Sequence, residues 1–293
     1  MELLKTVLPL LISGSLFGLV LAVGLDAEPR QLLYLIRQPA RLGRAVLVVS
    51  VLTPAAAAVL VSILPLHPMT KAGVLILSIS PVPPFVPGRN RMMGAGRDYV
   101  YGLFAAFALL AIVIVPVSAF IMGRIFGREA YVGFWPLIQL VFKTVLAPLA
   151  IGLLIGRFWP TFSRRVSPIL QKFSLAVLLV AAVPLLMKLW PVFGELVGDG
   201  TLLACVLFAL AALCFGHFLG DGEPGDRQAL AISAATRHPG IAILIAKTIG
   251  VNKEVMAASL LCFLICFIVS MPYQILQKRR LVHMAGGAPS ASV

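Results

Sequence analysis

Charged residues are scarce in this sequence of 293 residues: they make up 12% of it, and only 11 of them are Asp or Glu. A soluble globular domain carries about 25% charged and about 45–50% apolar residues, whereas 60% of this chain is apolar. A chain of this length cannot hide so large an apolar excess in a water-soluble core. The composition therefore excludes a soluble domain, a disordered chain and a collagen-like chain, and predicts an all-α integral membrane protein embedded in a lipid bilayer.

Cysteines and catalytic motifs are also few. The four cysteines all lie inside apolar runs, which indicates packing rather than a disulfide or zinc framework. The sequence has no Gly-Lys-Ser/Thr phosphate loop, no His-Glu-x-x-His motif and no Ser/His/Asp spacing typical of a hydrolase. We therefore expect no enzyme and no resident cofactor. The formal charge of +13 is spread between apolar segments rather than gathered in one patch, so we expect no nucleic-acid partner.

Apolar segments long enough to cross a bilayer, which takes about 20 residues, predict about nine transmembrane helices. Loops on one side of these segments, together with the C-terminal tail, carry most of the loop arginines and lysines, which predicts that this side is cytoplasmic. We expect a cell (inner) membrane protein with its N-terminus outside and a disordered cytoplasmic tail over 281–293. The nine segments are 5–24, 42–64, 69–94, 99–122, 131–155, 166–189, 201–219, 228–249 and 255–276.

Two of the nine segments are predicted to be broken. The third contains four prolines between Pro81 and Pro87, and no helix continues through such a run. The eighth is interrupted by Thr-Arg-His-Pro-Gly at 236–240. Non-helical backbone at membrane depth is tolerated only inside protein or beside a water-filled cavity, and two breaks in corresponding halves indicate the binding site of a transporter. Ordinary proline kinks in a helical bundle remain the alternative.

The breaks lie five segments apart, which predicts a five-helix unit used twice. An odd unit length gives the two copies opposite orientations in the membrane, and the first helix of the first copy is missing here. The first repeat covers about 5–126 and the second about 131–277, within one transmembrane domain over 5–277.

Arginines beside the breaks indicate an anionic or carboxylate-bearing solute. Arg89, Arg91 and Arg237 have few acids near them in the sequence, and a buried arginine normally faces a cavity, a partner or an anion. Half-helix N-termini would add positive ends of helix dipoles. The alternative for Arg237 is that it caps carbonyls exposed by the break. The candidate binding residues are Pro87, Gly88, Arg89, Asn90, Arg91, Ser233, Thr236, Arg237, His238, Pro239 and Gly240.

The chain resembles the bile acid:sodium symporter family. The resemblance is carried by Val-Gly-Leu at 23–25, Leu-Ile-Arg-Gln-Pro at 35–39, Ala-Gly-Arg-Asp at 95–98 and the run 233–242, and it extends over about 16–273. It implies a core domain with two crossed, unwound helices packed against a panel domain. It also implies transport of bile acids or other organic anions with sodium, and a nine-helix form without the first helix occurs in the family.

The sodium ligands that the resemblance implies are largely absent. The family's crossing helix carries Glu and then Gln-Asn, and the matching positions here are Ser233, Arg237 and His238. In the first break only Asn90 matches an expected ligand. The remaining ligand positions fall at residues without a suitable side chain, namely Val49, Gly102 and Ala106.

Loss of sodium ligands together with the arginines predicts a transporter with weakened or absent sodium coupling. A guanidinium at Arg237, or at Arg89 or Arg91, would supply the positive charge that sodium supplies in relatives. Such a protein would work by alternating access as a facilitator, an exchanger, or a proton-coupled carrier using His238, unless that histidine only packs. The alternatives are a conventional sodium:organic anion symporter, and a membrane sensor or membrane enzyme on the same fold. The solute, the coupling ion and the oligomeric state stay open.

Overall fold

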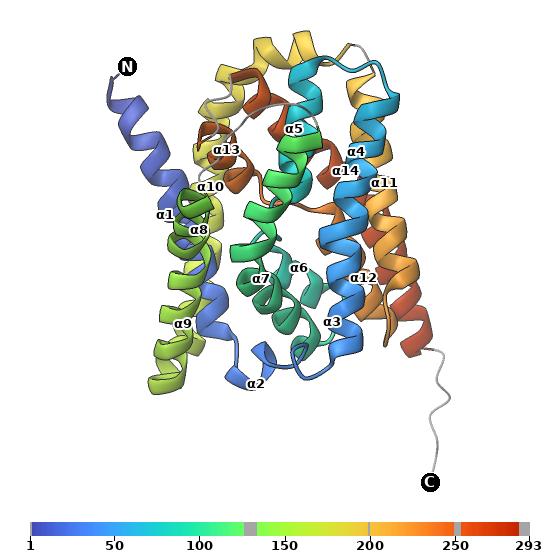
Figure 1. Cartoon of the computed structure of the whole chain (residues 1–293). Coiled ribbons are helices and arrows are strands. Elements are labelled where there is room, and N and C mark those ends of the chain that lie inside the picture. The colour runs from blue at the N-terminus through green and yellow to red at the C-terminus, as the bar shows by residue number, and fades with distance from the viewer. Residues whose placement is uncertain (1, 126–133, 199, 249–252, 287–293) are drawn as a thin grey trace.

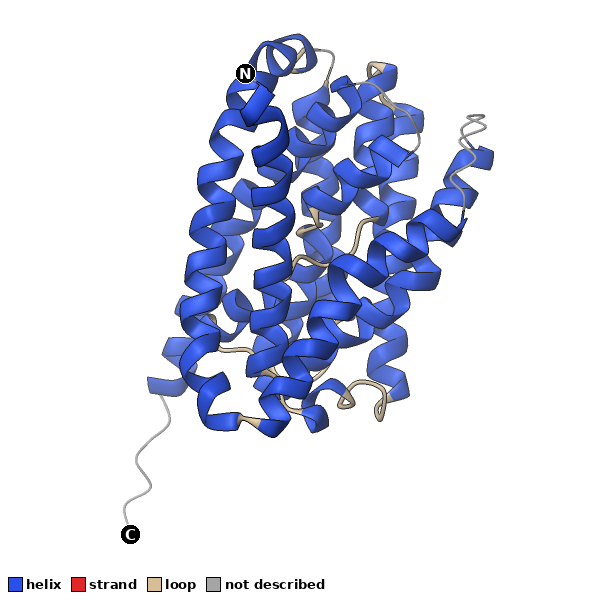
Figure 2. Ribbon diagram, turned by 90° about the vertical axis from the view of Figure 1, so that its left-hand side faces the viewer, coloured by secondary structure: helices blue, strands red, loops and turns tan. Residues whose placement is uncertain are grey.

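The computed structural model describes residues 2–125, 134–198, 200–248 and 253–286, and all regular elements in these ranges are helices (Figure 2). Arg128, the start of the predicted segment 131–155, residue 249 and the tail from 287 lie outside the described residues. Within these ranges, seven helices are long and apolar enough to cross a membrane: Val7–Asp26, Pro39–Ile63, Arg97–Met122, Trp135–Phe158, Pro160–Leu196, Thr201–Leu219 and Lys253–Arg280.

The helices follow one another with short connections (Figure 1). Two π-helical turns, η1 and η2, interrupt the second and fifth predicted segments. The elements are α1 (Glu2–Asp26), α2 (Pro29–Leu32), α3 (Pro39–Val46), η1 (Leu47–Leu52), α4 (Thr53–Ile63), α5 (Pro68–Ile79), α6 (Val86–Met92), α7 (Arg97–Ile125), α8 (Phe134–Val141), η2 (Phe142–Leu146), α9 (Ala147–Phe158), α10 (Pro160–Leu196), α11 (Thr201–Leu219), α12 (Pro224–Ala235), α13 (Pro239–Thr248) and α14 (Lys253–Gly286).

Both predicted breaks are confirmed. The third segment is divided into α5 and α6, because the prolines after Ser80 cannot donate to a helical carbonyl. The eighth is divided into α12 and α13, where Pro239 begins the second half. The remaining seven segments correspond to the seven long apolar helices. At the C-terminus, α14 continues to Gly286 and so includes the first six residues of the tail predicted to be disordered.

The π-helical turn η1 frees a backbone carbonyl. The Thr53 N–H donates to the Val48 carbonyl, five residues back, and Pro54 has no N–H to donate to Val49. The Val49 carbonyl therefore loses its usual helical donor, as happens where a π-helical turn shifts the register of a helix. This carbonyl becomes part of the site described below.

Helices α1, α9 and α10 form a closely packed group, which we call the α1 group; with α8 they lie along one side of the molecule (left in Figure 1). Gly24 and Gly152 bring α1 against α9: a Cβ added at Gly24 would lie 2.5 Å from the Leu149 carbonyl oxygen. The Ser167 hydroxyl on α10 donates to the Ala22 carbonyl on α1 at 2.9 Å. Small residues at such contacts are typical of membrane helices.

A larger group consists of α3, η1, α4–α7 and α11–α14. In it α11 packs along α12, α5 along α14, and α4 against α11. Large apolar side chains point outward from both groups: Trp190 is 73% exposed and Phe218 is 79% exposed. Exposed apolar side chains distributed around long apolar helices are expected for a protein whose surface contacts lipid.

Candidate functional site

The two breaks meet inside the larger group. The His238 N–H donates to the Pro81 carbonyl at 2.9 Å, which joins the unwound segment of the eighth predicted span to that of the third. Arg237 is 3% exposed. Its Nη1 donates to the Ser80 carbonyl at 3.3 Å and its Nη2 donates to the Val49 carbonyl.

Prolines explain why these carbonyls are available. Ser80 follows the last residue of α5, and the residue four positions later, Pro84, has no N–H to complete a helical turn. Val49 is left without a donor by η1 and Pro54. Buried carbonyls without a partner are costly, so Arg237 supplies donors that the prolines of two neighbouring segments remove. This is the capping role that the sequence leaves open for Arg237.

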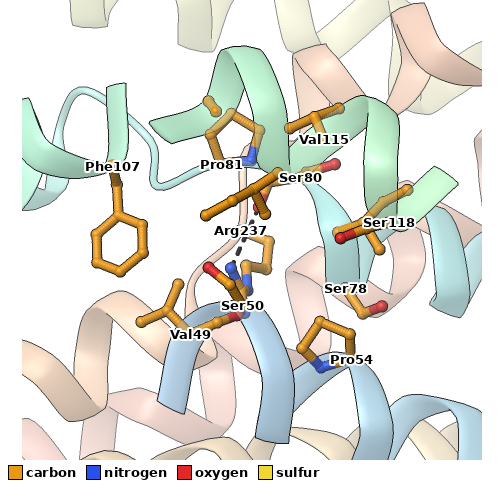
Figure 3. Close-up of a pocket in the computed structure, with 13 residues that line it drawn as sticks. Val49, Ser50, Pro54, Ser78, Ser80, Pro81, Phe107, Val115, Ser118 and Arg237 are labelled. Atoms are coloured by element: carbon orange, nitrogen blue, oxygen red, sulfur yellow. Dashed lines mark hydrogen bonds between the residues drawn. The ribbon is translucent and has the colours of Figure 1, made fainter. Parts of the chain in front are cut away.

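A small hollow lies beside Arg237, with about 20 Å³ open to water-sized molecules, enough for one or two waters. Figure 3 shows Arg237 between Ser80 and Pro81 on one side and Val49 and Ser50 on the other. The polar lining residues come from η1, α5, α7 and the break before α13, and most of the other lining residues, including Pro54, Phe107 and Val115, are apolar. The polar side chains are those of Ser50, Ser78, Ser80, Ser118 and Arg237.

Among the described residues, no acid pairs with the guanidinium of Arg237. The ion pairs formed within the described ranges involve Arg30, Arg41, Arg44, Arg91 and Arg97. The Nε of Arg237 has no hydrogen-bond partner in the described part of the chain. A permanently charged group is thus held in the protein interior by carbonyl oxygens alone.

His238 caps the second half of the broken helix. Its Nδ1 accepts from the Ile241 N–H at 3.3 Å and its carbonyl accepts from the Ala242 N–H at 3.0 Å. Because Nδ1 accepts, the proton of a neutral ring is on Nε2. These contacts fix the buried ring as an N-terminal cap of α13.

Residues of the first break that were predicted to join this site lie elsewhere. Arg91 Nη1 is 2.6 Å from Asp26 Oδ2, at the end of α1, and the Arg89 Cζ lies 4.3 Å from the centroid of the Phe267 ring on α14. The Asn90 Nδ2 donates to the Ala229 carbonyl on α12 at 3.3 Å. None of these three residues lines the hollow beside Arg237.

The other predicted site residues take structural positions around the breaks. Pro87 and Gly88 lie in the first turns of α6, and a Cβ at Gly88 would meet the Gln171 amide of α10. Ser233 and Thr236 are buried at the end of α12, and the Thr236 hydroxyl has no partner among the described atoms. Pro239 and Gly240 form the first turn of α13.

The sequence did not identify two serines that line the hollow, Ser50 and Ser118, or the acid Asp26. Ser50 and Ser118 stand in apolar stretches of the sequence, and no motif distinguishes them. Asp26 pairs with Arg91 and with Arg97, whose Nη2 lies 3.1 Å from Asp26 Oδ1, and the Tyr101 hydroxyl donates to the same carboxylate. We call Asp26, Arg91, Arg97 and Tyr101 the Asp26 cluster. No group of three or more His, Cys, Asp or Glu side chains suited to a metal ion occurs in the described ranges.

Asp226 lies at the start of α12, before the predicted span 228–249, and makes the stability of the folded protein depend on pH. It is buried, its Oδ1 accepts from the Gly96 N–H at 3.3 Å, and Arg41 is 3.8 Å from Oδ2. Burial raises the pKa of the Asp226 carboxyl to about 6. The folded state thus holds this proton more tightly than the unfolded state, so its contribution to stability falls as the pH rises from about 4 to about 6.

We therefore expect Asp226→Asn to raise the melting temperature at pH 7.5 and to change it little at pH 4.5. The stabilisation at pH 7.5 should be about 1–2 kcal/mol, measured by thermal unfolding of the purified protein in detergent. Asp221→Asn is the control, and it should change the melting temperature at pH 7.5 in the opposite direction. The Gly222 N–H, with help from Arg44, lowers the pKa of Asp221. An Asp226→Asn protein that is less stable than wild type at pH 7.5 would contradict the interpretation.

The long apolar helices, the two broken spans and the meeting of their unwound segments define a polytopic membrane protein with discontinuous helices, the architecture of secondary transporters. Residues 15–193 match the sequence profile of the Sodium Bile acid symporter family. The match covers more than half of the chain, and the chain belongs to this family. It includes the first break and ends before α11, so the Arg237 break lies beyond it. No individual curated protein matches the chain.

Proposed function

We propose that the protein is a secondary transporter of an organic anion or another small carboxylate-bearing solute, with weak or absent sodium coupling. The observation that carries this proposal is the position of the Arg237 guanidinium on the carbonyl oxygens of Val49 and Ser80. Unwound backbone carbonyls are the groups that bind sodium in transporters with broken helices. A fixed cation on these oxygens satisfies them and repels a second cation.

The arrangement of helices supports alternating access by an inverted repeat. In the predicted repeats α1 corresponds to α10, α4 to α11, and the broken pair α5/α6 to α12/α13. Each of these pairs is in contact: α1 packs along α10, α4 against α11, and the two breaks against each other. We infer that the α1 group acts as the panel and the larger group as the core. The start of α1 and the end of α14 lie at opposite ends of the molecule (Figure 1), as an odd number of membrane crossings requires.

Uptake into liposomes containing the purified protein tests the proposal. Accumulation of labelled organic acids is measured with an inward gradient of sodium, potassium or choline. We expect at least one organic acid to be taken up at equal rates in the three cations. Uptake that depends on sodium, with a sub-millimolar activation constant for sodium, would show a conventional symporter and overturn the coupling proposal. Binding without uptake would indicate a sensor, and chemical change of the solute an enzyme; either would overturn transport.

A further inference from the structure

The connection between α9 and α10 carries basic side chains that no acid balances. All of them are exposed, and none pairs with an acid among the described residues. The sequence has no Asp or Glu over residues 130–194. We call these side chains the basic connection; one lies in the last turn of α9 and three in the first four turns of α10, namely Arg157, Arg164, Arg165 and Lys172.

The arginines of α3, which lies at the same end of the molecule as the end of α9 (Figure 1), are balanced within the chain. The Arg44 Nη1 is 2.5 Å from Asp221 Oδ2, and the Arg41 Nη1 is 3.8 Å from Asp226 Oδ2. The basic connection has no such partners in the described ranges. Its positive charge is therefore open to an anion from outside the chain.

Arg165 and Lys172 share one face of α10, because seven residues make two helical turns. Ser163 and Ser167 are buried on the opposite face, where the Ser167 hydroxyl donates to the Ala22 carbonyl on α1. The shared face of the two cations thus points away from the α1 group. Helical side chains lean toward the N-terminus of their helix, and lysine extends its charged end along apolar surface toward water. Both features bring the Lys172 ammonium toward the level of Arg165.

Exposed apolar side chains border these two cations. Ile169 and Phe173, one turn beyond Arg165 and Lys172 on neighbouring positions of α10, are 67% and 66% exposed, and Trp159, between α9 and α10, is 63% exposed. Tryptophan side chains are typical of the level of lipid headgroups at a membrane surface. The surface therefore combines positive charge with the apolar contact that an acyl chain makes.

We propose that the basic connection binds the headgroup of an anionic phospholipid, whose phosphate lies on Arg165 and Lys172 and whose acyl chains lie along Ile169 and Phe173. This connection is on the side predicted to be cytoplasmic, and the cytoplasmic leaflet holds anionic lipids that attract basic segments beside membrane helices. The apolar border favours a lipid over a free phosphate, which has no acyl chain to contact it. The inference does not rest on the proposed transport.

Quenching of Trp159 fluorescence by brominated lipids tests the proposal. Trp135 and Trp190 are exposed, so Trp135→Phe combined with Trp190→Phe leaves Trp159 as the single tryptophan of a folded protein. This protein is reconstituted in phosphatidylcholine vesicles with a rising fraction of brominated phosphatidylglycerol or brominated phosphatidylcholine. We expect the anionic lipid to bind at least about tenfold more tightly beside Trp159, since each of the two cations contributes a factor of about five near a membrane surface.

Two further proteins separate the basic connection from the overall charge of the chain. Arg165→Gln combined with Lys172→Gln should lower the preference for phosphatidylglycerol about fivefold or more, whereas Lys188→Gln should leave it unchanged. Lys188 is the matched control, because it is an exposed lysine of the same helix, toward the other end of α10. A protein with Trp190 as its single tryptophan should show a smaller preference, since in α10 only Lys188 among the basic residues lies close to Trp190 in the sequence.

Four results would overturn the proposal. They are equal quenching of Trp159 by the two lipids, an unchanged preference in the double glutamine variant, equal preferences beside Trp159 and Trp190, and loss of the preference when inorganic phosphate is added at constant ionic strength. The last result would assign the basic connection to free phosphate. Quenching is measured without solute, so failure of the lipid site and failure of the transport proposal remain distinguishable.

Discussion

Arg237→Gln is expected to reduce solute uptake in liposomes at least tenfold. The substitution removes the fixed positive charge at the meeting point of the two breaks and leaves the carbonyls of Val49 and Ser80 with at most one amide donor group. A buried carbonyl without a partner costs about 1–3 kcal/mol, so the crossing should also become less stable. Initial rates of uptake, normalised to the folded protein in the liposomes, measure the effect.

A second variant of Arg237 separates the effect of its charge from that of its geometry, and a variant of Arg30 serves as the control. Arg237→Lys keeps the charge but loses the planar fork that reaches two carbonyls, so an intermediate rate is expected. Arg30→Gln changes an arginine whose side chain is 74% exposed and should leave uptake unchanged. Arg237→Gln uptake equal to wild type would show that the guanidinium has no part in transport.

Gly216→Val is expected to prevent stable packing of α11 on α12. A Cβ at Gly216 would overlap the Cα of Ala231 and lie 2.6 Å from its backbone nitrogen. Backbone atoms cannot turn away as a side chain can, so the helices must separate, and the loss should exceed about 4 kcal/mol. Since α12 leads directly to Arg237, uptake should be lost together with the fold. Size-exclusion elution and the melting temperature of the detergent-solubilised protein measure the effect.

Gly43→Ala is the matched control for this prediction. A Cβ at Gly43, in α3, would meet nothing within 4 Å, and alanine is the better helix former by about 1 kcal/mol. The Gly43→Ala protein should therefore melt at or slightly above the wild-type temperature. A Gly216→Val protein that melted as high as wild type would show that α11 and α12 do not approach as closely as described.

Local signals in the sequence were sufficient to predict the breaks. The prolines after Ser80 and before Gly240 act on the backbone of their own segments, so their effect does not depend on distant partners. Of the nine predicted segments, the seven without a break were located for the same reason, because bilayer-spanning length is a local property. For Arg237 the sequence indicated a buried cation at a break and left capping as one of its possible roles.

The partners of the charged groups could not be predicted, because they are far apart in the chain. Arg91 pairs with Asp26, 65 residues away, and Arg237 reaches Val49, 188 residues away. The Val49 carbonyl is available only because η1 and Pro54 act together, and a proline four residues after a serine does not by itself predict a π-helical turn. Ser118 joins the site through the packing of α7, which apolar periodicity does not specify.

The Asp26 cluster differs from the Arg237 contacts in what it connects. Every partner of Arg237 belongs to the larger group, so these bonds would travel with that group as one body. Asp26 ends α1, whereas Arg91, Arg97 and Tyr101 belong to α6 and α7. Any motion that separates α1 from α6 and α7 at this end must release the same carboxylate from all three partners together. The Asp26 cluster therefore joins the end of α1 to α6 and α7, and because its side chains are partly exposed, dissolved salt weakens this connection.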